Sequence, residues 1–422
     1  MDDQLLIGID VGTTKICTLV AREEGPDQLR VLGVGIESSQ GLRKGVVVDL
    51  EAAAQAVARS IEKAERTSGV EILGALVSMA GSNVSSVNSR GVVGVSGRVI
   101  DSDDVARAVD AARAVAIPHG REIVHVIQRN FNVDGQDGIR MPLGMHGYRL
   151  EVETHIITAA ATGIENLRQC IAAAGVDVTQ FVLNPLASAE VALDENERQM
   201  GVAVCDIGGG TTDLASYVDG DVWHTAVLAI GGNHITSDIA QVLHLPSSQA
   251  EEVKLQHGHA NPAEIDPRQY FNIRPFGEDD VVQVSHMDLV QIIHARVEEI
   301  FGMVVQEIKR SGYDGLLPAG LVLTGGTALL PGIKSVAAKV LGVPVRVAQP
   351  TGLVGMTDKL ESPAFATTIG LLKWALLMNE VTAPVEGARR RSRSKPGATP
   401  AGDLVPGLDR EKIKNLLKRL LP

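Results

Sequence analysis

The chain has 422 residues, more than a single hydrophobic core usually serves, so two large lobes are expected rather than one compact domain. Hydrophobic residues make up 45% of the sequence and charged residues 21%, which excludes a largely disordered or membrane-spanning protein. Aromatic residues, at 3%, are too sparse to form the stacking platforms that bind single-stranded nucleic acid.

The net charge of −12 is unevenly distributed along the chain. Residues 388–422 contain ten Lys or Arg and three Asp or Glu, a net charge of +7, which leaves −19 for the remainder. Such an acidic body repels nucleic acid and anionic membranes. Only the C-terminal segment is suited to an anionic surface, and no nucleic-acid partner is expected.

The N-terminal part of the chain predicts an α/β lobe. Apolar runs at 5–10 and 15–22, joined by a Gly-Thr-Thr turn, predict a β-hairpin. An alanine-rich helix is expected at 49–66, with Asp49 as its N-cap, followed by a strand at 72–79.

The stretch at 84–163 has a different pattern and predicts a separate inserted module. A helix is expected there at 103–115, with strands at 123–133 and 148–159. A second hairpin, with strands at 202–207 and 213–218 around a glycine-rich turn, then repeats the opening unit after about 200 residues. This internal duplication predicts two related lobes.

A largely helical region at 233–310 forms a further candidate module. A strand at 320–324, a glycine pair and a helix at 334–341 follow, and the apolar run at 364–378 is also helical. The next segment is rich in Arg, Ser, Pro and Gly, which predicts a disordered linker. The predicted subdivision is a first-lobe core at 1–83 with 164–196 and 361–386, an inserted subdomain at 84–163, a second-lobe core at 197–232 with 311–360, a helical subdomain at 233–310, a linker at 387–407 and a C-terminal helix at 408–422.

Cysteine usage and the N-terminus favour a cytosolic protein. Cys17, Cys170 and Cys205 lie in apolar stretches without metal-ligand spacing, so buried reduced thiols are expected. The first six residues carry two Asp and no cationic segment, which argues against a secretory signal. No apolar run approaches the roughly 18 to 20 residues that span a bilayer, so any membrane contact is expected to be peripheral.

The first hairpin turn, GIDVGTTK at 8–15, carries the residue types that a polyphosphate requires. Close approach of phosphate to the backbone needs glycine and several N–H donors, and the accompanying Mg²⁺ needs a carboxylate. Gly12, Thr13 and Thr14 supply the former and Asp10 the latter. A tight turn without a ligand is the alternative interpretation.

The second hairpin turn, DIGGGTTDL at 206–214, places three consecutive glycines before two hydroxyls and between two acids. So many glycines weaken a strand, and close approach of a ligand explains them better than packing does. Both turns in this order support a nucleotide site more strongly than either turn alone. The residues expected to bind phosphate here are Gly208, Gly209, Gly210, Thr211 and Thr212.

A third segment, LTGGTALLPG, places Gly325, Gly326 and Thr327 between a strand and a helix, where ligands of open α/β folds bind. A plain glycine turn is the alternative. Glu251 and Lys254, three residues apart on one predicted helix face, are candidates for hydrogen bonds to a ribose. A solvated ion pair is the other interpretation of these two residues.

These three motifs, in this order, resemble the phosphate-1, phosphate-2 and adenosine motifs of the actin, Hsp70 and sugar-kinase superfamily, with connecting helices at 184–193 and 364–372. Within that superfamily the chain is similar to the bacterial FtsA family of cell-division proteins over residues 5–422. The inserted module, the segment VLNPLASAEVAL followed by GVAVCDIGGGTTDLA, and the C-terminal helix carry this resemblance. It implies an α/β, actin-like ATPase fold of two lobes with duplicated ribonuclease-H-like subdomains, and ATP with Mg²⁺ as ligands.

The last fifteen residues, LDREKIKNLLKRLLP, have the pattern of a basic amphipathic helix. Apolar residues recur at i, i+3, i+4, i+7 and i+8, an arc of about 140°, and Asp409 is suited to cap the N-terminus. Docking of this helix on a protein surface is the alternative to membrane binding. The residues expected to contact an anionic membrane are Leu408, Ile413, Leu416, Leu417, Leu420 and Leu421 on the apolar face and Lys412, Lys414, Lys418 and Arg419 around it.

The two acids that begin the turns are the expected metal ligands. Asp10 and Asp206 position Mg²⁺ through its waters, while the two turns, with Lys15, hold the β- and γ-phosphates. In Hsp70-like relatives a Glu at the start of the first connecting helix orients the attacking water, and the matching residue here is Asn184. An amide cannot accept a proton as a carboxylate does, so slow hydrolysis is expected, with Glu190 as a candidate substitute.

By resemblance, the expected partner is the C-terminal peptide of the tubulin-like division protein FtsZ, docked on the region 233–310. The resemblance also implies longitudinal self-association into actin-like filaments and contact with other division proteins. It implies a location on the cytoplasmic face of the membrane at the division site.

Other members of the superfamily provide the alternative functions. A sugar or small-metabolite kinase needs a catalytic Asp in a polar substrate cleft, for which the sequence offers no convincing candidate. An Hsp70-like chaperone needs a peptide-binding domain, and only about fifty residues follow Gly370. A pilus-assembly or rod-shape protein is disfavoured by the C-terminal helix and the inserted module.

Overall fold

The structure is a computed structural model that describes residues 5–25, 28–96, 99–115, 117–277, 280–312, 317–356 and 360–382. The chain divides into two compact units. The larger contains Met1–Asn88, Ala116–His125 and His155–Ala375, and the smaller contains Ser89–Val115, Val126–Thr154 and, of the described C-terminal residues, 376–382. The predicted linker at 387–407 and the predicted amphipathic helix at 408–422 lie outside the described residues.

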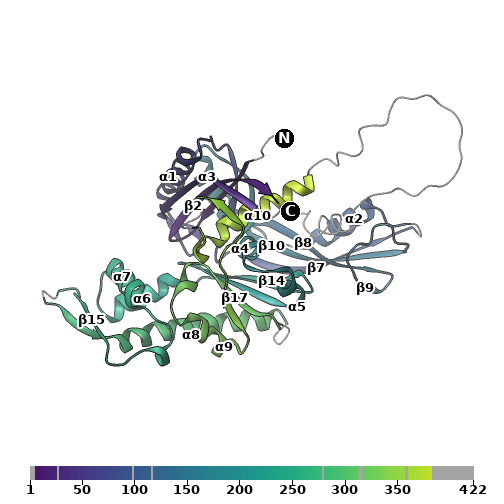
Figure 1. Cartoon of the computed structure of the whole chain (residues 1–422). Helices are drawn as coiled ribbons and strands as arrows, with labels where there is room; N and C mark the ends of the chain where they lie inside the picture. The colour runs from purple at the N-terminus through teal and green to yellow at the C-terminus, as the bar shows by residue number, and fades with distance from the viewer. Residues whose placement is uncertain are drawn as a thin grey trace, which may run out of the picture. The chain divides into compact units, whose positions relative to one another are not determined.

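The first sheet of the larger unit grows from the hairpin at the start of the chain. Its strands, in sheet order, are β11 (Asp177–Leu183), β6 (Gly74–Met79), β1 (Leu5–Val11), β2 (Lys15–Gly25), β3 (Gln28–Ser38) and β19 (Leu353–Gly355). Strands β1, β2 and β3 pair antiparallel, whereas β6 and β11 continue the sheet in parallel on the other side of β1. Asp10 lies opposite Cys17 in the β1–β2 pair, next to the turn. Helix α1 (Leu50–Ser68) packs on β2, β3 and α3 (Ala161–Ala172) (Figure 1).

The second sheet repeats the order and directions of five of these strands, all but β19. Its strands, in sheet order, are β14 (Asp221–Leu228), β13 (Thr212–Val218), β12 (Val202–Ile207), β17 (Gly320–Thr324) and β18 (Val345–Val347). Again three strands pair antiparallel and two continue in parallel. Asp206 lies opposite Asp213, at the place that corresponds to Asp10 and Cys17. The shared strand order and directions are the duplication that the two hairpins predict.

Local sequence explains where α1 begins and ends. The side chain of Asp49 accepts a hydrogen bond from the backbone N–H of Ala52 at 3.1 Å, as the predicted N-cap should. Gly69, with φ of +71°, ends the helix in the left-handed conformation that glycine adopts without strain. The residues of its apolar face that join the core of the first sheet are Ala56, Val57, Ile61 and Ala64.

The region predicted to be helical, 233–310, contains one feature that the prediction missed. Its helices are α6 (Gly232–Val242), α7 (Ser247–His257), the short η1 (Pro262–Glu264) and α8 (His286–Arg310). After this region, η2 (Gly326–Leu329) and α9 (Ile333–Leu341) follow β17 in the second-lobe core. Between α7 and α8, strands β15 (Tyr270–Ile273) and β16 (Val282–Ser285) form an antiparallel hairpin. Phe271 and Ile273 are buried while their neighbours are exposed, so the missed signal was a short alternation of period two.

The smaller unit is built around a four-stranded sheet. Its strands, in sheet order, are β7 (Ser85–Gly94), β10 (Arg149–Ala160), β8 (Arg121–Val133) and β9 (Gln136–Ile139). Helix α2 (Ser102–Arg113) begins with a capping box formed by Asp101 and Asp104. A Cβ on Gly91 of β7 would lie 1.9 Å from the carbonyl oxygen of Ala108, so glycine is what lets this helix pack directly on the strand.

Two connecting helices lie behind the hairpin turns in the larger unit. They are α4 (Asn184–Ala192) and α10 (Ala366–Thr382). The short helix α5 (Glu195–Met200) follows α4, and η3 (Pro363–Phe365) precedes α10. Two short strands, β4 (Leu42–Arg43) and β5 (Val46–Val47), lie between β3 and α1 in the chain. A Cβ on Gly370 would lie 1.8 Å from the carbonyl oxygen of Ala187, so α10 and α4 cross at backbone contact distance. Helix α10 begins two residues later than the run predicted at 364–378 because η3 precedes it.

Cys17, Cys170 and Cys205 are buried free thiols, as predicted. Burial raises the pKa of Cys17 to about 12, so this thiol stays protonated at neutral pH. Within the described part of the chain, no helix combines the length and the apolar character needed to cross a membrane.

Candidate functional site

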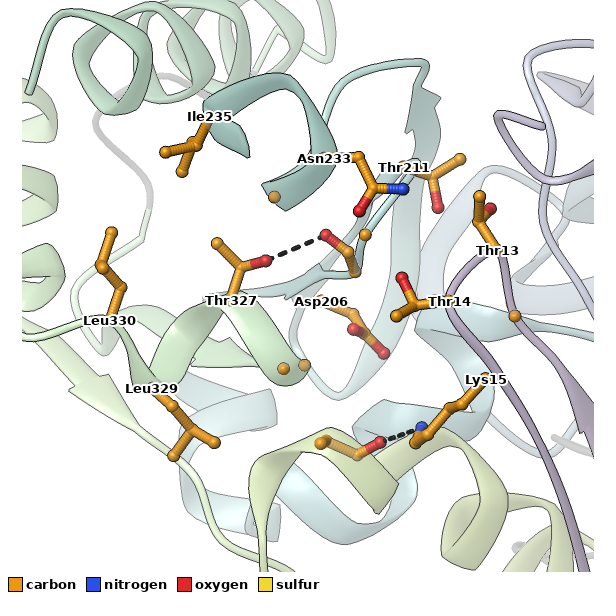
Figure 2. Close-up of a pocket in the computed structure, with 18 of the residues that line it drawn as sticks. Thr13, Thr14, Lys15, Asp206, Thr211, Asn233, Ile235, Thr327, Leu329 and Leu330 are labelled. Carbon is orange, nitrogen blue, oxygen red and sulfur yellow. Dashed lines mark hydrogen bonds between the residues drawn. The ribbon is translucent and has the colours of Figure 1, made fainter. Parts of the chain in front are cut away.

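The turns of both hairpins and the loop after β17 line one cavity of about 340 Å³. Its size lies within the range of small-molecule sites. Figure 2 shows Thr13, Thr14 and Lys15 of the first turn facing Asp206 and Thr211 of the second. The predicted site residues that the structure brings together here are Asp10, Gly12, Thr13, Thr14, Lys15, Asn184, Asp206, Gly208, Gly209, Gly210, Thr211, Glu251, Lys254, Gly325, Gly326 and Thr327.

Two glycines of the second turn are needed because the first turn packs directly against them, which the sequence alone did not predict. A Cβ on Gly209 would lie 1.9 Å from Oγ1 of Thr14, and one on Gly210 would lie 2.5 Å from Oγ1 of Thr13. The two turns therefore fit against each other only because these side chains are absent. Gly208 differs, since its nearest neighbour would be the carbonyl oxygen of Thr211 at 3.4 Å, an ordinary contact distance. The interpretation of these glycines by ligand approach alone was incomplete.

The carboxylate of Asp10 is held by donors from three separate segments. Its Oδ1 accepts a hydrogen bond from the hydroxyl of Ser78 at 2.8 Å, and its Oδ2 accepts one from Thr368 at 3.2 Å. Nζ of Lys15 lies 3.7 Å from the same Oδ2 and donates to the carbonyl oxygen of Ala364 at 2.5 Å. Asp10 is only 5% exposed, so these partners fix its orientation in the cavity.

The environment of Asp206 disfavours its ionised form. Its Oδ2 accepts a hydrogen bond from the hydroxyl of Thr367 at 2.7 Å. Burial nonetheless raises the pKa of Asp206 to about 6, because the hydrogen bond offsets only part of the lost hydration. A Cβ on Gly325 would lie 2.4 Å from its Oδ1, and Gly325 has φ of +87°, so glycine is required there for both space and conformation.

Asp213 is a site residue that the prediction did not include. It lines the cavity next to Asn184, whose Nδ2 lies 3.5 Å from its Oδ2, and Thr211 donates a hydrogen bond to that same oxygen at 3.1 Å. Burial, followed by the charge of Asp206, raises the pKa of Asp213 well above its usual value. Among the described residues, Oδ1 of Asp213 and Oδ1 of Asn184 have no hydrogen-bond partner. Two buried acceptors without donors are suited to a water or a cation.

The predicted ribose pair forms part of a compact polar cluster at one side of the cavity. Nζ of Lys254 lies 2.7 Å from the carboxylate of Glu251 and donates to Oγ1 of Thr236 at 2.9 Å and to the carbonyl oxygen of Gly232 at 3.3 Å. The hydroxyl of Thr236 in turn donates to Glu251. Both predicted residues are therefore oriented by α6 and line the cavity, Lys254 largely buried and Glu251 partly exposed.

Apolar side chains line the side of the cavity opposite the turns. Figure 2 shows Ile235, Leu329 and Leu330 there, away from Thr13 and Thr14. Leu329 is 54% exposed, so its side chain presents apolar surface to the cavity. The cavity thus offers hydroxyl, amide and carboxylate groups at one end and an apolar surface at the other. Leu329 and Leu330 belong to the predicted segment LTGGTALLPG, but neither they nor Ile235 could be singled out from the sequence, because isolated apolar residues give no periodic signal.

Two family models match this chain. The model of cell division protein FtsA matches residues 203–370, and the model of the SHS2 domain inserted in FTSA matches residues 81–158. The cell division protein FtsA of Pseudomonas aeruginosa is 38% identical over 373 residues, which cover 88% of this chain and 89% of that protein. The chain belongs to the FtsA family. As such it is an actin-like cell-division protein, and the predicted family is confirmed.

Solved structures share the fold of this FtsA-family chain. One, from the PilM-PilN type IV pilus biogenesis complex, has a TM-score of 0.64 at 17% identity and covers 87% of this chain and 97% of that one. Another, MreB5 of Spiroplasma citri bound to ADP, has a TM-score of 0.53 at 15% identity and covers 88% of this chain and 95% of that one. The likeness at these identities concerns the fold, and it confirms the predicted actin-like α/β architecture.

Two predicted site residues lie away from the cavity of this FtsA-family chain. The carboxylate of Glu190 lies 3.3 Å from the guanidinium of Arg198, and Glu190 is absent from the cavity lining. The hydroxyl of Thr212 donates to the carbonyl oxygen of Ile230 at 2.8 Å, and Thr212 is fully buried. The side chains of a strand alternate between faces, so Thr212 points away where Thr211 and Asp213 point in.

The residues present fit a nucleotide bound with Mg²⁺. Mg²⁺ is usually held by one or two carboxylates together with phosphate oxygens and waters, and Asp10 and Asp206 both line the cavity. Glycine-rich turns present backbone N–H groups to phosphates, and Lys15 adds a cation beside them. The apolar surface at Leu329 and Leu330 is suited to a flat base.

Proposed function

We propose that this chain binds ATP with Mg²⁺ between its two hairpin turns. The observation that carries the proposal is the meeting of two acids, Asp10 and Asp206, from duplicated hairpins in one cavity that also contains Lys15. When bound, the metal would neutralise phosphate charge. The solved MreB5 structure, which has the same fold, is bound to ADP.

Each part of the site has a separate role in this proposal. Backbone N–H groups of the triple-glycine turn and the hydroxyls of Thr13 and Thr14 hold the phosphates. Asp10 and Asp206 would hold Mg²⁺ in this site and so place it beside the phosphates. Glu251 and Lys254, oriented by their mutual ion pair, bind the ribose. The base then lies against the apolar surface.

Calorimetry on the purified full-length protein tests this proposal. ATP in excess Mg²⁺ should bind with a measurable heat, and binding should weaken at least about tenfold when EDTA replaces Mg²⁺. Asp10→Asn should reduce the difference in ATP affinity between the Mg²⁺ buffer and the EDTA buffer. The absence of any adenine-nucleotide binding to the wild-type protein would sink the proposal.

We further propose that hydrolysis of the bound ATP is slow. Asn184 stands where a carboxylate would orient and deprotonate water, and its amide cannot accept a proton. Glu190, the candidate substitute, is paired with Arg198 instead. Single-turnover measurements should give a rate constant well below the values of about 1 to 10³ s⁻¹ that are typical of enzymes. A rate within that range would contradict this part of the proposal.

Family membership supports a cellular role as a tether in cell division. We propose that the chain links filaments of the tubulin-like FtsZ to the cytoplasmic face of the membrane, binds the FtsZ C-terminal peptide through the region 233–310, and assembles with itself and with other division proteins. The sequence pattern at 408–422 supports membrane attachment. One such helix binds reversibly, so self-assembly should strengthen attachment through avidity.

Vesicle flotation tests the tether. Full-length protein should float with vesicles that contain anionic lipid, and Leu417→Glu, on the apolar face of the predicted helix, should abolish most of this binding. Asn415→Glu makes the same change on the polar face and serves as the matched control, since it removes no apolar contact. Equal flotation of both variants would argue against insertion of the predicted face.

A further inference from the structure

Two consecutive threonines in the first turn of α10 reach the two acids of the cavity. The hydroxyl of Thr367 donates to Oδ2 of Asp206 at 2.7 Å, and the hydroxyl of Thr368 donates to Oδ2 of Asp10 at 3.2 Å. Thr367 is 6% exposed and Thr368 is fully buried, so neither hydroxyl has bulk water as an alternative partner. One helical turn is therefore bonded to an acid from each of the two duplicated hairpins.

The two threonines use their hydroxyl protons differently from many helical threonines. A helical threonine commonly donates its single hydroxyl proton to a backbone carbonyl three or four residues earlier. Here both protons are directed to carboxylates instead. Successive helical residues are rotated by about 100°, which lets neighbouring side chains reach acids on two different sheets.

The short helix η3, which leads directly into this turn, is fixed on both sides. The carbonyl oxygen of Pro363 accepts hydrogen bonds from Oγ1 of Thr324 at 3.3 Å and from the backbone N–H of Gly325 at 3.1 Å. On the other side, Nζ of Lys15 donates to the carbonyl oxygen of Ala364. The crossing of α10 and α4 at Gly370 holds the rest of the helix. The two hydroxyls are thus presented by a rigid support.

We propose that Thr367 and Thr368 are positioning residues that orient Asp206 and Asp10 for Mg²⁺. The inference rests on the proposed binding of ATP with Mg²⁺ and deepens it. Partners hydrogen-bonded to ligating carboxylates fix their orientation, and loss of such partners typically costs 10- to 100-fold in metal affinity. Because the two threonines are consecutive, one helical turn also fixes the separation of the two acids.

A role in packing alone makes a different prediction from a role in positioning. If the threonines only stabilise the junction of α10 with the hairpins, their loss should weaken nucleotide binding equally with and without metal. If they position the acids for Mg²⁺, the loss should be confined to the metal-dependent part of the affinity. The ratio of the ATP dissociation constants in EDTA and in Mg²⁺ separates the two roles.

The experiment measures this ratio by calorimetry for wild type, Thr367→Val, Thr368→Val and the double variant. Valine keeps the branched shape and removes the hydroxyl. Each single variant should raise the dissociation constant in Mg²⁺ about tenfold or more, change the value in EDTA by less than about threefold, and so lower the ratio. Thr367→Ser and Thr368→Ser, which restore a hydroxyl, should return the ratio to the wild-type value.

Thr18→Val is the matched control. Thr18 is fully buried in β2, and its hydroxyl is bonded to that of Ser60, away from the cavity. This variant should leave both dissociation constants unchanged. Thermal melting of every variant checks that it is folded, and if the double variant does not fold, the single and serine variants still decide the question.

Two results would overturn the inference while leaving ATP binding intact. One is an equal loss of affinity in both buffers, and the other is an unchanged ratio in the valine variants. A wild-type protein that binds no ATP in either buffer would instead remove the proposed function, and the inference with it. Failure of the serine variants to restore the ratio would show that the methyl groups matter rather than the hydroxyls.

Discussion

The two hairpins of the duplicated lobes have the same topology but different residues at matching positions. In the first, Asp10 lies opposite Cys17, and in the second, Asp206 lies opposite Asp213. The first turn carries Lys15 and two separate glycines, Gly8 and Gly12, whereas the second carries three consecutive glycines and no cation. Duplication has thus kept one acid in each half and made the surroundings unequal.

This difference shows where unfavourable electrostatics are concentrated. Asp10 has Ser78, Thr368 and Lys15 near its carboxylate. In the second half, burial raises the pKa of Asp206 to about 6 and that of Asp213 well above its usual value. Two buried acids side by side cost folding free energy, and a bound cation would relieve that cost. The second half is therefore the part of the site that most needs its ligand.

The largest effect is expected where the two turns touch. Gly210→Ala places a Cβ within 2.5 Å of Oγ1 and 2.9 Å of Cβ of Thr13, so the turns must separate. Overpacking of this kind costs about 1–3 kcal/mol, which corresponds to roughly a 5- to 150-fold rise in the ATP dissociation constant if the whole cost falls on the ATP-binding state. Calorimetry measures this change.

Gly208→Ala is the control within the same triplet. Its Cβ would meet only the carbonyl oxygen of Thr211 at 3.4 Å, so the affinity should change by less than about threefold. Equal losses for both variants would show that the glycines serve ligand approach and that contact between the turns is unimportant.

A smaller effect, of opposite sign, is expected on stability at Asp206. Its raised pKa means that the ionised carboxylate is disfavoured in the folded state, so Asp206→Asn should stabilise the metal-free protein at pH 7 by about 1–3 kcal/mol. The same change should weaken Mg²⁺-dependent ATP binding. Urea unfolding in EDTA measures the free-energy difference between the variant and the wild type.

The pH dependence of that difference identifies its cause. Because the pKa of Asp206 is higher in the folded protein than in the unfolded chain, its carboxyl supports the folded state only while it is protonated. This stabilising contribution to the free energy of unfolding is fully present below the unfolded pKa of about 4 and is lost as pH rises through about 6. The advantage of Asp206→Asn should therefore be absent near pH 4 and complete above about pH 6.5. An advantage that is the same at every pH would attribute it to packing instead of ionisation.

The smallest effect is expected at Cys17, the counterpart of Asp213. Burial raises the pKa of Cys17 to about 12, so the thiol is neutral, and Cys17→Ala removes one buried sulfur at a cost of about 1 kcal/mol. Cys17→Asp, which rebuilds the second hairpin's pair of acids in the first, should destabilise the protein by more than Cys17→Ala does. Thermal melting compares the two, and equal melting temperatures would contradict this account.

The sequence by itself determined the two hairpins, the family and most of the cavity lining. The turns GIDVGTTK and DIGGGTTDL encode their own geometry and chemistry within a few residues, and alternating apolar strands around them predict the duplicated α/β lobes. Asp49 likewise predicts its helix start from local capping alone. Local signals of this kind need no knowledge of distant contacts.

The tertiary structure alone decided which distant groups meet the two acids. Thr368 lies 358 residues from Asp10 and Thr367 lies 161 residues from Asp206, and no periodic pattern links positions so far apart. The same reason explains why Glu190 was a candidate although it pairs with Arg198, and why Asp213 was missed. Side-chain direction and burial depend on how whole sheets and helices pack, and that packing is set by the complete chain rather than by any short segment of it.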